Sequence, residues 1–209
     1  MSFNKRVLSP GGLPFVNNEN FKTVLYTGNG STQSITVGFK PDFVWISQRN
    51  ATNHSRILDT TRGATKILYS GLTYQEDTES TGLTAFTDTG FNLGSQQSVN
   101  DSNDTYVAWC WKANGGTTSS NSDGSITSTV QANQDAGFSI VTYTGTGSNA
   151  SVGHGLGKAP KWILVKMRSN AKNWVVYHAG NTNAPETEFL TLNSTVATED
   201  YNMWQDTAP

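Results

Sequence analysis

Cysteine is almost absent from this sequence, because Cys110 is the single one in 209 residues. One thiol cannot form an internal disulfide framework or a cysteine-based zinc site. Charge is also scarce, since 14% of the residues are charged and the formal net charge is −2. The sequence has no run of basic residues that could contact a phosphate backbone, and this absence argues against nucleic-acid binding. No apolar stretch approaches the roughly 20 residues of a membrane-spanning helix, so we expect no membrane span.

The residue patterns of hydrolases are missing as well. None of the three histidines lies in a Gly-x-Ser-x-Gly or His-Glu-x-x-His context. The densest acidic cluster, Glu76–Glu79, is interpreted as a solvated loop rather than as paired catalytic carboxylates. The Asx-rich segment Asp101–Asp104 lacks the glycine and the terminal glutamate of a calcium loop and is interpreted as a plain turn. We therefore expect no catalytic residue, no metal site, no cofactor and no enzyme activity.

Aromatic and β-branched residues, by contrast, are plentiful. Six Trp, seven Tyr and nine Phe supply apolar area for a core, and Thr and Val are common while Glu, Lys and Ala are few. This composition favours strands over helices. The stretch Thr105–Lys112, TYVAWCWK, is apolar on both faces. It predicts a central strand covered on both sides, with Cys110 as an inert core thiol.

A long internal repeat organises the chain. YTGNGS begins at Tyr26 and YTGTGS at Tyr143, which is 143 − 26 = 117 residues later. Pro41 and Pro160 each precede an aromatic residue and a hydrophobic run, at an offset of 160 − 41 = 119 residues. Similar offsets maintained from motif to motif indicate two copies of one module rather than a chance match.

The repeat predicts four parts and an incomplete second copy. The parts are, in order, an N-terminal docking arm (1–22), a first β-sandwich module (23–113), a linker or loop rich in Gly, Ser, Thr and Asn (114–124) and a second β-sandwich module (125–209). The second copy has no counterpart of Gly90–Gly94 or of Thr105–Lys112. We expect an open apolar face there, completed by a continuation of the natural chain or by a partner subunit.

Two sets of apolar residues are candidates for contacts with partners. The first set lies in the arm and comprises Val7, Leu13, Phe15 and Val16. Apolar side chains on a free tail would stay exposed to water, so we expect this set to dock on a partner. The second set lies in the second module and comprises Trp174, Tyr177, Tyr201 and Trp204. Aromatic faces stack on sugar rings, so this second set is a candidate glycan surface. The alternative, which the sequence leaves open, is that at least half of these aromatics belong to a core.

Several stretches resemble a module found in tail-fibre and other virion proteins of marine bacteriophages. They are Gly38–Ile46, Asp59–Ala64, Gly90–Gly94 and Asp104–Ala113, and Gly153–Pro160 is similar to the opening of the next copy. The resemblance covers residues 23–209. It implies an all-β fold of tandem concanavalin-like antiparallel β-sandwich (jelly-roll) modules with an extended N-terminal arm. It also implies a structural or adhesive role rather than catalysis.

The leading hypothesis from the sequence is a bacteriophage virion structural protein, namely the N-terminal, tail-attaching part of a tail fibre. Its arm would bind other phage tail or head proteins, and we expect a homo-oligomer, with a trimer expected from fibres generally. A head decoration or head-fibre subunit is the close variant, placed second to the tail. The alternative from another class is a carbohydrate-binding lectin module for host surface polysaccharide. A depolymerising enzyme ranks third, with the carboxylates at 76–79 as its first candidates.

Overall fold

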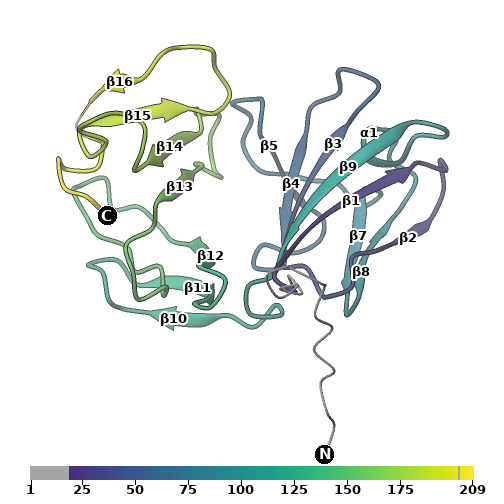
Figure 1. Cartoon of the computed structure of the whole chain (residues 1–209), viewed down its shortest axis with the longest axis horizontal. Coiled ribbons are helices and arrows are strands. Elements are labelled where there is room, and N and C mark those ends of the chain that lie inside the picture. The colour runs from purple at the N-terminus through teal and green to yellow at the C-terminus, as the bar shows by residue number, and fades with distance from the viewer. Residues whose placement is uncertain (1–18, 202) are drawn as a thin grey trace, which may run out of the picture.

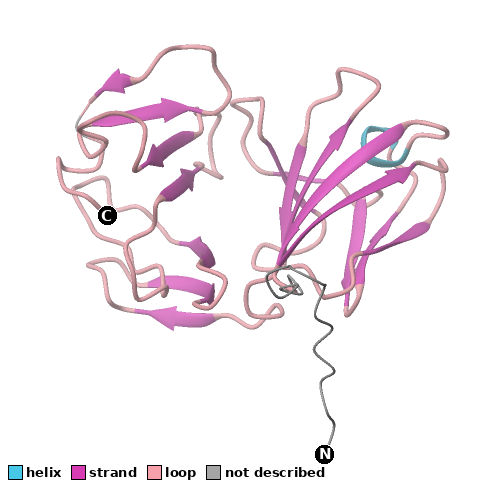
Figure 2. Ribbon diagram, in the orientation of Figure 1, coloured by secondary structure: helices cyan, strands magenta, loops and turns pink. Residues whose placement is uncertain are grey.

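The computed structural model describes residues 19–201 and 203–209 (Figure 1). Over this range the regular secondary structure is almost entirely β-strand, with one short helix, α1 (Gln97–Asn100). The strands gather into two groups, one for each copy of the repeat (Figure 2). None of the helical structure in this range has the length and apolarity of a membrane span. The arm residues named above lie outside the described residues; they are Val7, Leu13, Phe15 and Val16.

The first module is a sandwich of two antiparallel sheets, so the predicted all-β sandwich class is confirmed. The larger sheet has the strand order β1-β9-β3-β4-β5-β6, and the smaller has the order β2-β8-β7. Helix α1 lies in the connection between β8 and β9. The strands are β1 (Phe21–Thr27), β2 (Gln33–Thr36), β3 (Phe43–Gln48), β4 (Arg56–Asp59), β5 (Lys66–Tyr69), β6 (Asp77–Thr78), β7 (Leu83–Thr87), β8 (Gly90–Leu93) and β9 (Thr105–Trp111).

The main hydrophobic core fills the space between these two sheets. Strand β9 alternates between buried and half-buried residues, and Tyr106, Ala108 and Cys110 are 0% exposed on its inner face. Phe91 and Leu93 of the smaller sheet close the core from the other side. An alternation of period two gives a strand one face that is buried, so the sequence pattern leads directly to the sandwich.

Strand β9 lies in the middle of the larger sheet, as its apolar sequence predicts. It pairs antiparallel with β1 on one edge and with β3 on the other. Its second face carries Trp109 and Trp111, which are half-buried. The Trp111 ring stacks on that of Phe138 in the second module, with the ring centroids 6.0 Å apart. The neighbouring module therefore contributes to the cover of this second face.

A buried asparagine holds the YTGNGS loop that follows β1. Asn100 is 0% exposed, and its side chain donates to the carbonyl oxygen of Gly94 at 2.7 Å and accepts from the backbone N–H of Asn29 at 3.1 Å. Gly28 packs so closely on this turn that an added Cβ would lie 2.1 Å from the carbonyl oxygen of Asp101. Because no side chain fits at that distance, residue 28 has to be glycine.

The second module forms two further sheets within the described residues. One has the order β10-β11-β12 and the other the order β13-β14-β15-β16. Strand β10 lies inside the segment 114–124, interpreted above as a linker or loop, and it pairs with β11. The strands are β10 (Ser119–Asn121), β11 (Ser128–Asn133), β12 (Phe138–Thr142), β13 (Trp162–Val165), β14 (Val175–His178), β15 (Glu188–Thr191) and β16 (Glu199–Asp200).

Strand positions confirm the internal repeat. Strand β13 begins 162 − 43 = 119 residues after β3, and β14 begins 175 − 56 = 119 residues after β4. Strands β15 and β16 follow β5 and β6 at 188 − 66 = 122 and 199 − 77 = 122 residues. Strand β12 begins 138 − 21 = 117 residues after β1. The two modules therefore share one plan from β1 and β12 onward, and β10 and β11 precede this shared part in the second copy.

Candidate functional site

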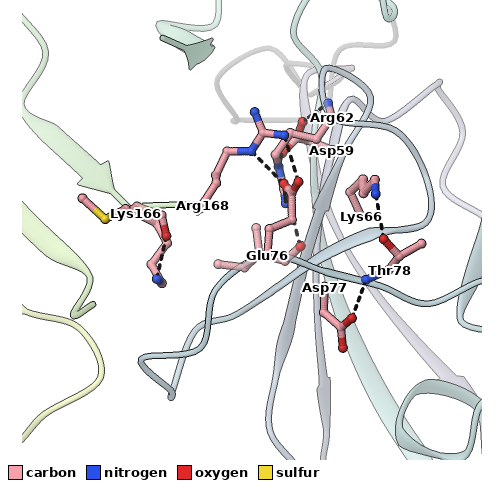
Figure 3. Close-up of polar contacts among 10 residues, drawn as sticks. Asp59, Arg62, Lys66, Glu76, Asp77, Thr78, Lys166 and Arg168 are labelled. Atoms are coloured by element: carbon pink, nitrogen blue, oxygen red, sulfur yellow. Dashed lines mark hydrogen bonds and ion pairs between the residues drawn. The ribbon is translucent and has the colours of Figure 1, made fainter. Parts of the chain in front are cut away.

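The contact between the two modules is the most elaborate polar site in the described residues. At its centre lies Glu76, just before β6. Its carboxylate accepts two hydrogen bonds of 2.8 Å from Nε and Nη2 of Arg168, which follows β13 in the second module. A third bond of 3.2 Å comes from Nη1 of Arg62 in the first module. Figure 3 shows the carboxylate held between the two guanidinium groups.

Asp59, at the end of β4, extends this network on the side of the first module. It accepts a hydrogen bond of 2.6 Å from Nε of Arg62, and the Arg62 side chain is 3% exposed. Arg62 also donates to the carbonyl oxygen of Ile57 at 3.1 Å. The guanidinium is thus fixed by three acceptors, which orients it toward Glu76. A bidentate pair on the outside and a buried arginine on the inside give the contact a defined geometry.

The electrostatics of the site favour the charged forms. Burial raises the pKa of Glu76, but hydrogen bonds and charge from Arg168 and Arg62 outweigh it, and the net pKa lies below its ordinary value. The hydrogen bond to Glu76 raises the pKa of Arg168 in turn. Each partner therefore stabilises the ionised state of the other.

The acidic cluster is therefore not the solvated loop inferred from the sequence. The side chains of Glu76 and Glu79 are 13% and 12% exposed. Glu79 accepts from Nε2 of Gln96 at 2.7 Å and pairs with Arg56 at 3.4 Å. Both glutamates are structural partners of arginines, and the interpretation fails because arginines distant in sequence converge on them. Sequence spacing alone does not show such convergence.

A tryptophan from the second module forms the apolar part of the contact. Trp174, just before β14, is 4% exposed and packs in a cluster with Ile57 and Leu68, on the outer face of the larger sheet. Its indole Nε1 donates to the carbonyl oxygen of Tyr69 at 2.8 Å. The side chain is thus buried with its polar atom satisfied, which is the arrangement that makes tryptophan an effective anchor.

A buried glutamine joins the modules on the side of the connection between them. Gln131 of β11 is 0% exposed, and its Nε2 donates to the hydroxyl oxygens of Thr60 and Thr61 at 2.9 Å and 2.7 Å. Its Oε1 accepts from the backbone N–H of Gly116 at 2.9 Å. One side chain therefore ties the connecting segment and the second module to the first module.

The four aromatics proposed as a glycan surface do not form one exposed face. Trp174 and Tyr177 are 4% and 3% exposed, so neither is free to stack on a sugar. Trp204 is half-buried and stacks edge-on against Tyr177, with the ring centroids 5.6 Å apart. Tyr201 is 66% exposed. The prediction of a shared surface is wrong for the two buried residues, and for them the alternative of core residues is correct.

Sequence reasoning missed an exposed aromatic at the edge of the contact. Tyr74 is 58% exposed and lies in a hollow whose wall includes Glu76, Asp77 and Ala171. Its ring packs edge-on against Tyr69, with the ring centroids 5.8 Å apart. Its sequence neighbours, Thr73 and Gln75, gave no signal. Only the folded arrangement places it beside the second module.

The remaining sequence candidates have structural roles. Burial raises the pKa of the Cys110 thiol to about 12, although Lys22 acts in the opposite direction. Asp104 accepts hydrogen bonds from Gln48 at 2.6 Å and Asn50 at 2.9 Å, which ties the turn before β9 to the loop after β3. Within residues 19–201 and 203–209, no three His, Cys, Asp or Glu side chains are placed to hold a metal ion.

A family model described as a domain of unknown function (DUF7483) matches residues 17–209. No curated protein and no solved structure matches the chain.

Proposed function

We propose that this chain, which belongs to the DUF7483 family, is a structural protein of a bacteriophage particle, the N-terminal, tail-attaching part of a tail fibre. The observation that carries the proposal is the locked contact between two successive copies of one module. Buried side chains on both sides of the connection join the copies, with Trp174 and Gln131 as the central members. A fibre needs its modules in fixed succession, because it transmits force and position along its length.

The connection between the modules supports this role. Gly116 is held by Gln131, and β10 pairs with β11, so the segment from one module to the next is tied down at two points. A flexible spacer would instead have an unpaired backbone of Gly and Ser. The contact also includes the ion pair of Glu76 with Arg168, so its apolar and polar parts resist rotation of one module on the other.

The pairing of the charged groups supports a structural rather than a catalytic role. Catalytic groups have shifted pKa values and face a cleft where a substrate binds. Glu76 and Arg168 have shifted pKa values, but each has the other as its partner. Their hydrogen-bonding capacity is spent on the contact between modules.

Immunogold electron microscopy tests the proposal. An antibody raised against the intact protein is applied to phage particles whose genomes encode this chain, beside particles from a phage without it. We expect gold at the tail, on the side where fibres attach. Label on the head would favour the decoration or head-fibre variant. Particles that carry no label, and in which mass spectrometry detects no peptide of this chain, would overturn both. Light scattering on the purified chain measures the oligomer, for which we expect a trimer.

A second candidate, a lectin module for host surface polysaccharide, is favoured by the hollow at Tyr74. An exposed aromatic ring beside the carboxylate of Asp77 and the amide of Gln75 offers both stacking and hydrogen bonds to sugar hydroxyls. A glycan array with the intact protein and with Tyr74→Ala tests it, with Tyr143→Ala as a control at an exposed tyrosine of the second module. Binding lost only in Tyr74→Ala supports this candidate, and the absence of binding by the intact protein rejects it.

A further inference from the structure

The two modules differ in the strand that lies beside the counterparts of β1 and β3. In the first module β9 lies between β1 and β3 and pairs with both. In the second module the counterparts of β1 and β3 are β12 and β13, and within the described residues each has one strand neighbour, β11 and β14 respectively. Each therefore has one edge without a neighbouring strand there. Such an edge carries a row of N–H and C=O groups ready to pair with another strand.

Backbone hydrogen bonds identify which edge of β13 this is. In the first module Thr60 N donates to the carbonyl oxygen of Asp42 at 2.9 Å, beside the pairing of β3 with β4. In the second module Ala179 N donates to the carbonyl oxygen of Lys161 at 2.9 Å, beside the pairing of β13 with β14. Both pairs are related by the same offset, 179 − 60 = 119 and 161 − 42 = 119 residues. Strand β14 therefore pairs with the edge of β13 that corresponds to the β4-facing edge of β3. The other edge of β13, which has no neighbouring strand, corresponds to the edge of β3 that pairs with β9.

Burial differs at the same place. Val44 and Ile46 of β3 are 0% and 1% exposed. Their counterparts on β13, Ile163 and Val165, are half-buried. Tyr143, the counterpart of Tyr26, is 46% exposed, whereas the hydroxyl of Tyr26 donates to the carbonyl oxygen of Val99 in α1 at 2.8 Å. Apolar residues are thus present where the first module has its core. In the first module these positions lie beside β9 and face the smaller sheet β2-β8-β7, and the described residues of the second module form a counterpart of neither.

A glycine in the second copy of the repeat motif points to the same missing element. Gly145 corresponds to Gly28, at 145 − 28 = 117 residues. At Gly28 an added Cβ would lie 2.1 Å from the carbonyl oxygen of Asp101, whereas at Gly145 it would meet nothing within 4 Å. The second copy therefore has a glycine at the position where the first copy needs one to make room for the turn at residues 100–104. In the described residues no such turn packs against Gly145.

We propose that β12 and β13 form an acceptor site for one β-strand of the β9 type. The occupant is a polypeptide segment with the chemistry of residues 100–111: an Asn-bearing turn followed by a strand that is apolar on both faces. It runs antiparallel to both β12 and β13, as β9 does to β1 and β3. A second copy of the described chain is not the occupant, because its own β9 is buried between β1 and β3. This site concerns the fold and holds whether or not the chain is part of a virion.

Strand addition accounts for all three observations. Main-chain hydrogen bonds to two edges would give affinity, and side chains on one face of the added strand would pack beside the half-buried side chains of β12 and β13. The turn before the strand would pack on Gly145, as Asn100 and Asp101 pack on the loop at Gly28. A strand without that turn would satisfy the edges but would leave the glycine loop without its partner.

A peptide experiment tests the site. The probe is a synthetic peptide with the sequence of residues 100–112, NDSNDTYVAWCWK, added to the intact 209-residue protein under reducing conditions. We expect one peptide per chain by calorimetry, and amide hydrogen exchange slowed by about tenfold or more in β12 and β13. Exchange in β1 and β3 should stay unchanged. A scrambled peptide of the same composition is the control.

A matched pair of variants and a third variant tested with two peptides sharpen the test. Val141→Lys places a charge on β12 at a half-buried position and should weaken binding about tenfold or more, whereas Thr129→Lys adds the same charge at an exposed position of β11 and should not. Gly145→Ala should weaken binding of the peptide 100–112 but not of a shorter peptide, 105–112, which lacks the turn. Gly145→Ala changes an exposed residue, so the comparison of the two peptides remains informative if Val141→Lys fails to fold.

Three results would overturn the proposal. The first is unchanged exchange in β12 and β13 at a saturating peptide concentration. The second is equal protection by the scrambled peptide. The third is a dimer whose β12 and β13 amides are protected before peptide is added, because a second copy would then be the occupant.

Discussion

Trp174 of the second module donates its indole N–H to the carbonyl oxygen of Tyr69 in the first module, at 2.8 Å. The two residues are 174 − 69 = 105 positions apart in the chain. The bond leaves the large apolar ring with no unsatisfied polar atom, so the whole side chain can be buried between the modules. This inserted side chain is one of the contacts that fix the orientation of the second module on the first.

The first prediction concerns this anchor. Trp174→Ala should lower the free energy of unfolding of the second module by about 3–5 kcal/mol, because it removes a buried aromatic side chain and leaves a cavity. Denaturant unfolding followed by hydrogen exchange resolves the two modules. Trp162→Ala is the matched control, since Trp162 is 48% exposed, and it should cost much less. Equal effects of the two variants would contradict the role of Trp174 as an anchor.

The second prediction concerns pH. The pKa of Glu76 is lower in the folded state than its ordinary value of 4.5. The ion pair with Arg168 therefore stabilises the fold above that ordinary value, and the contribution is lost as the pH falls through the folded-state pKa. Glu76→Gln should reduce stability at neutral pH by about 1–2 kcal/mol, at the low end for charged hydrogen bonds because Arg168 is partly exposed to solvent.

Unfolding free energies of the wild type and of Glu76→Gln, measured from pH 7 down to about pH 3, check this linkage. The difference between them should be constant at the upper end of the range and should shrink below the ordinary pKa of the carboxyl. Arg168→Gln should show the same trend, because it removes the other half of the pair. A difference that persists unchanged to the acid end would mean that Glu76 acts by packing alone.

The third prediction compares two glycines of the same repeat motif. Gly28→Ala should destabilise the first module by more than about 2 kcal/mol, because its Cβ would collide with backbone atoms. Gly145→Ala should leave the melting temperature of the 209-residue protein almost unchanged, since its Cβ meets nothing within 4 Å. Thermal unfolding of the two variants provides the measurement. A large loss of stability in Gly145→Ala would show that its loop already packs against something.

The fourth prediction concerns the single thiol. Burial raises the pKa of the Cys110 thiol to about 12, so the thiol stays protonated at pH 8, and the buried side chain is also inaccessible to reagents. Labelling by an aromatic disulfide reagent should therefore follow the rate at which the first module opens. Gly28→Ala lowers the stability of the first module, so it should raise the labelling rate in proportion to the increase in the population of the open form. Fast labelling of the native wild type would show that β9 leaves the sheet far more easily than its burial implies.

Much of the fold could be predicted from the sequence, because it depends on local alternation and on repetition. The central position of Thr105–Trp111 follows from an apolar pattern on both faces, and the repeat follows from motifs at matching offsets. What covers the second face of β9 could not be predicted. Phe138 reaches Trp111 from another module, and no local pattern specifies such a contact.

The contact between modules was the part that the sequence did not reveal. Glu76 looked like a member of a solvated acidic run because its arginine partners lie far away in the chain, and Arg168 is 168 − 76 = 92 residues distant. One signal was present, however. Trp174 stands where the first copy has Ser55, at the offset of 174 − 55 = 119 residues. A change from a small polar residue to tryptophan between two copies marks a surface whose surroundings differ, which here is the neighbouring module.

The position of β9 also has a consequence for biosynthesis. Its partner β1 is finished long before it, since Phe21 pairs with Trp111, 111 − 21 = 90 residues later. The last strand of the module to leave the ribosome is thus the one that fills the middle of its larger sheet. Until then β1 lacks its partner strand and β3 has one unpaired edge. Such non-local pairing is slow and leaves the chain prone to misassociation. Chaperone demand during translation should therefore fall once residue 111 emerges.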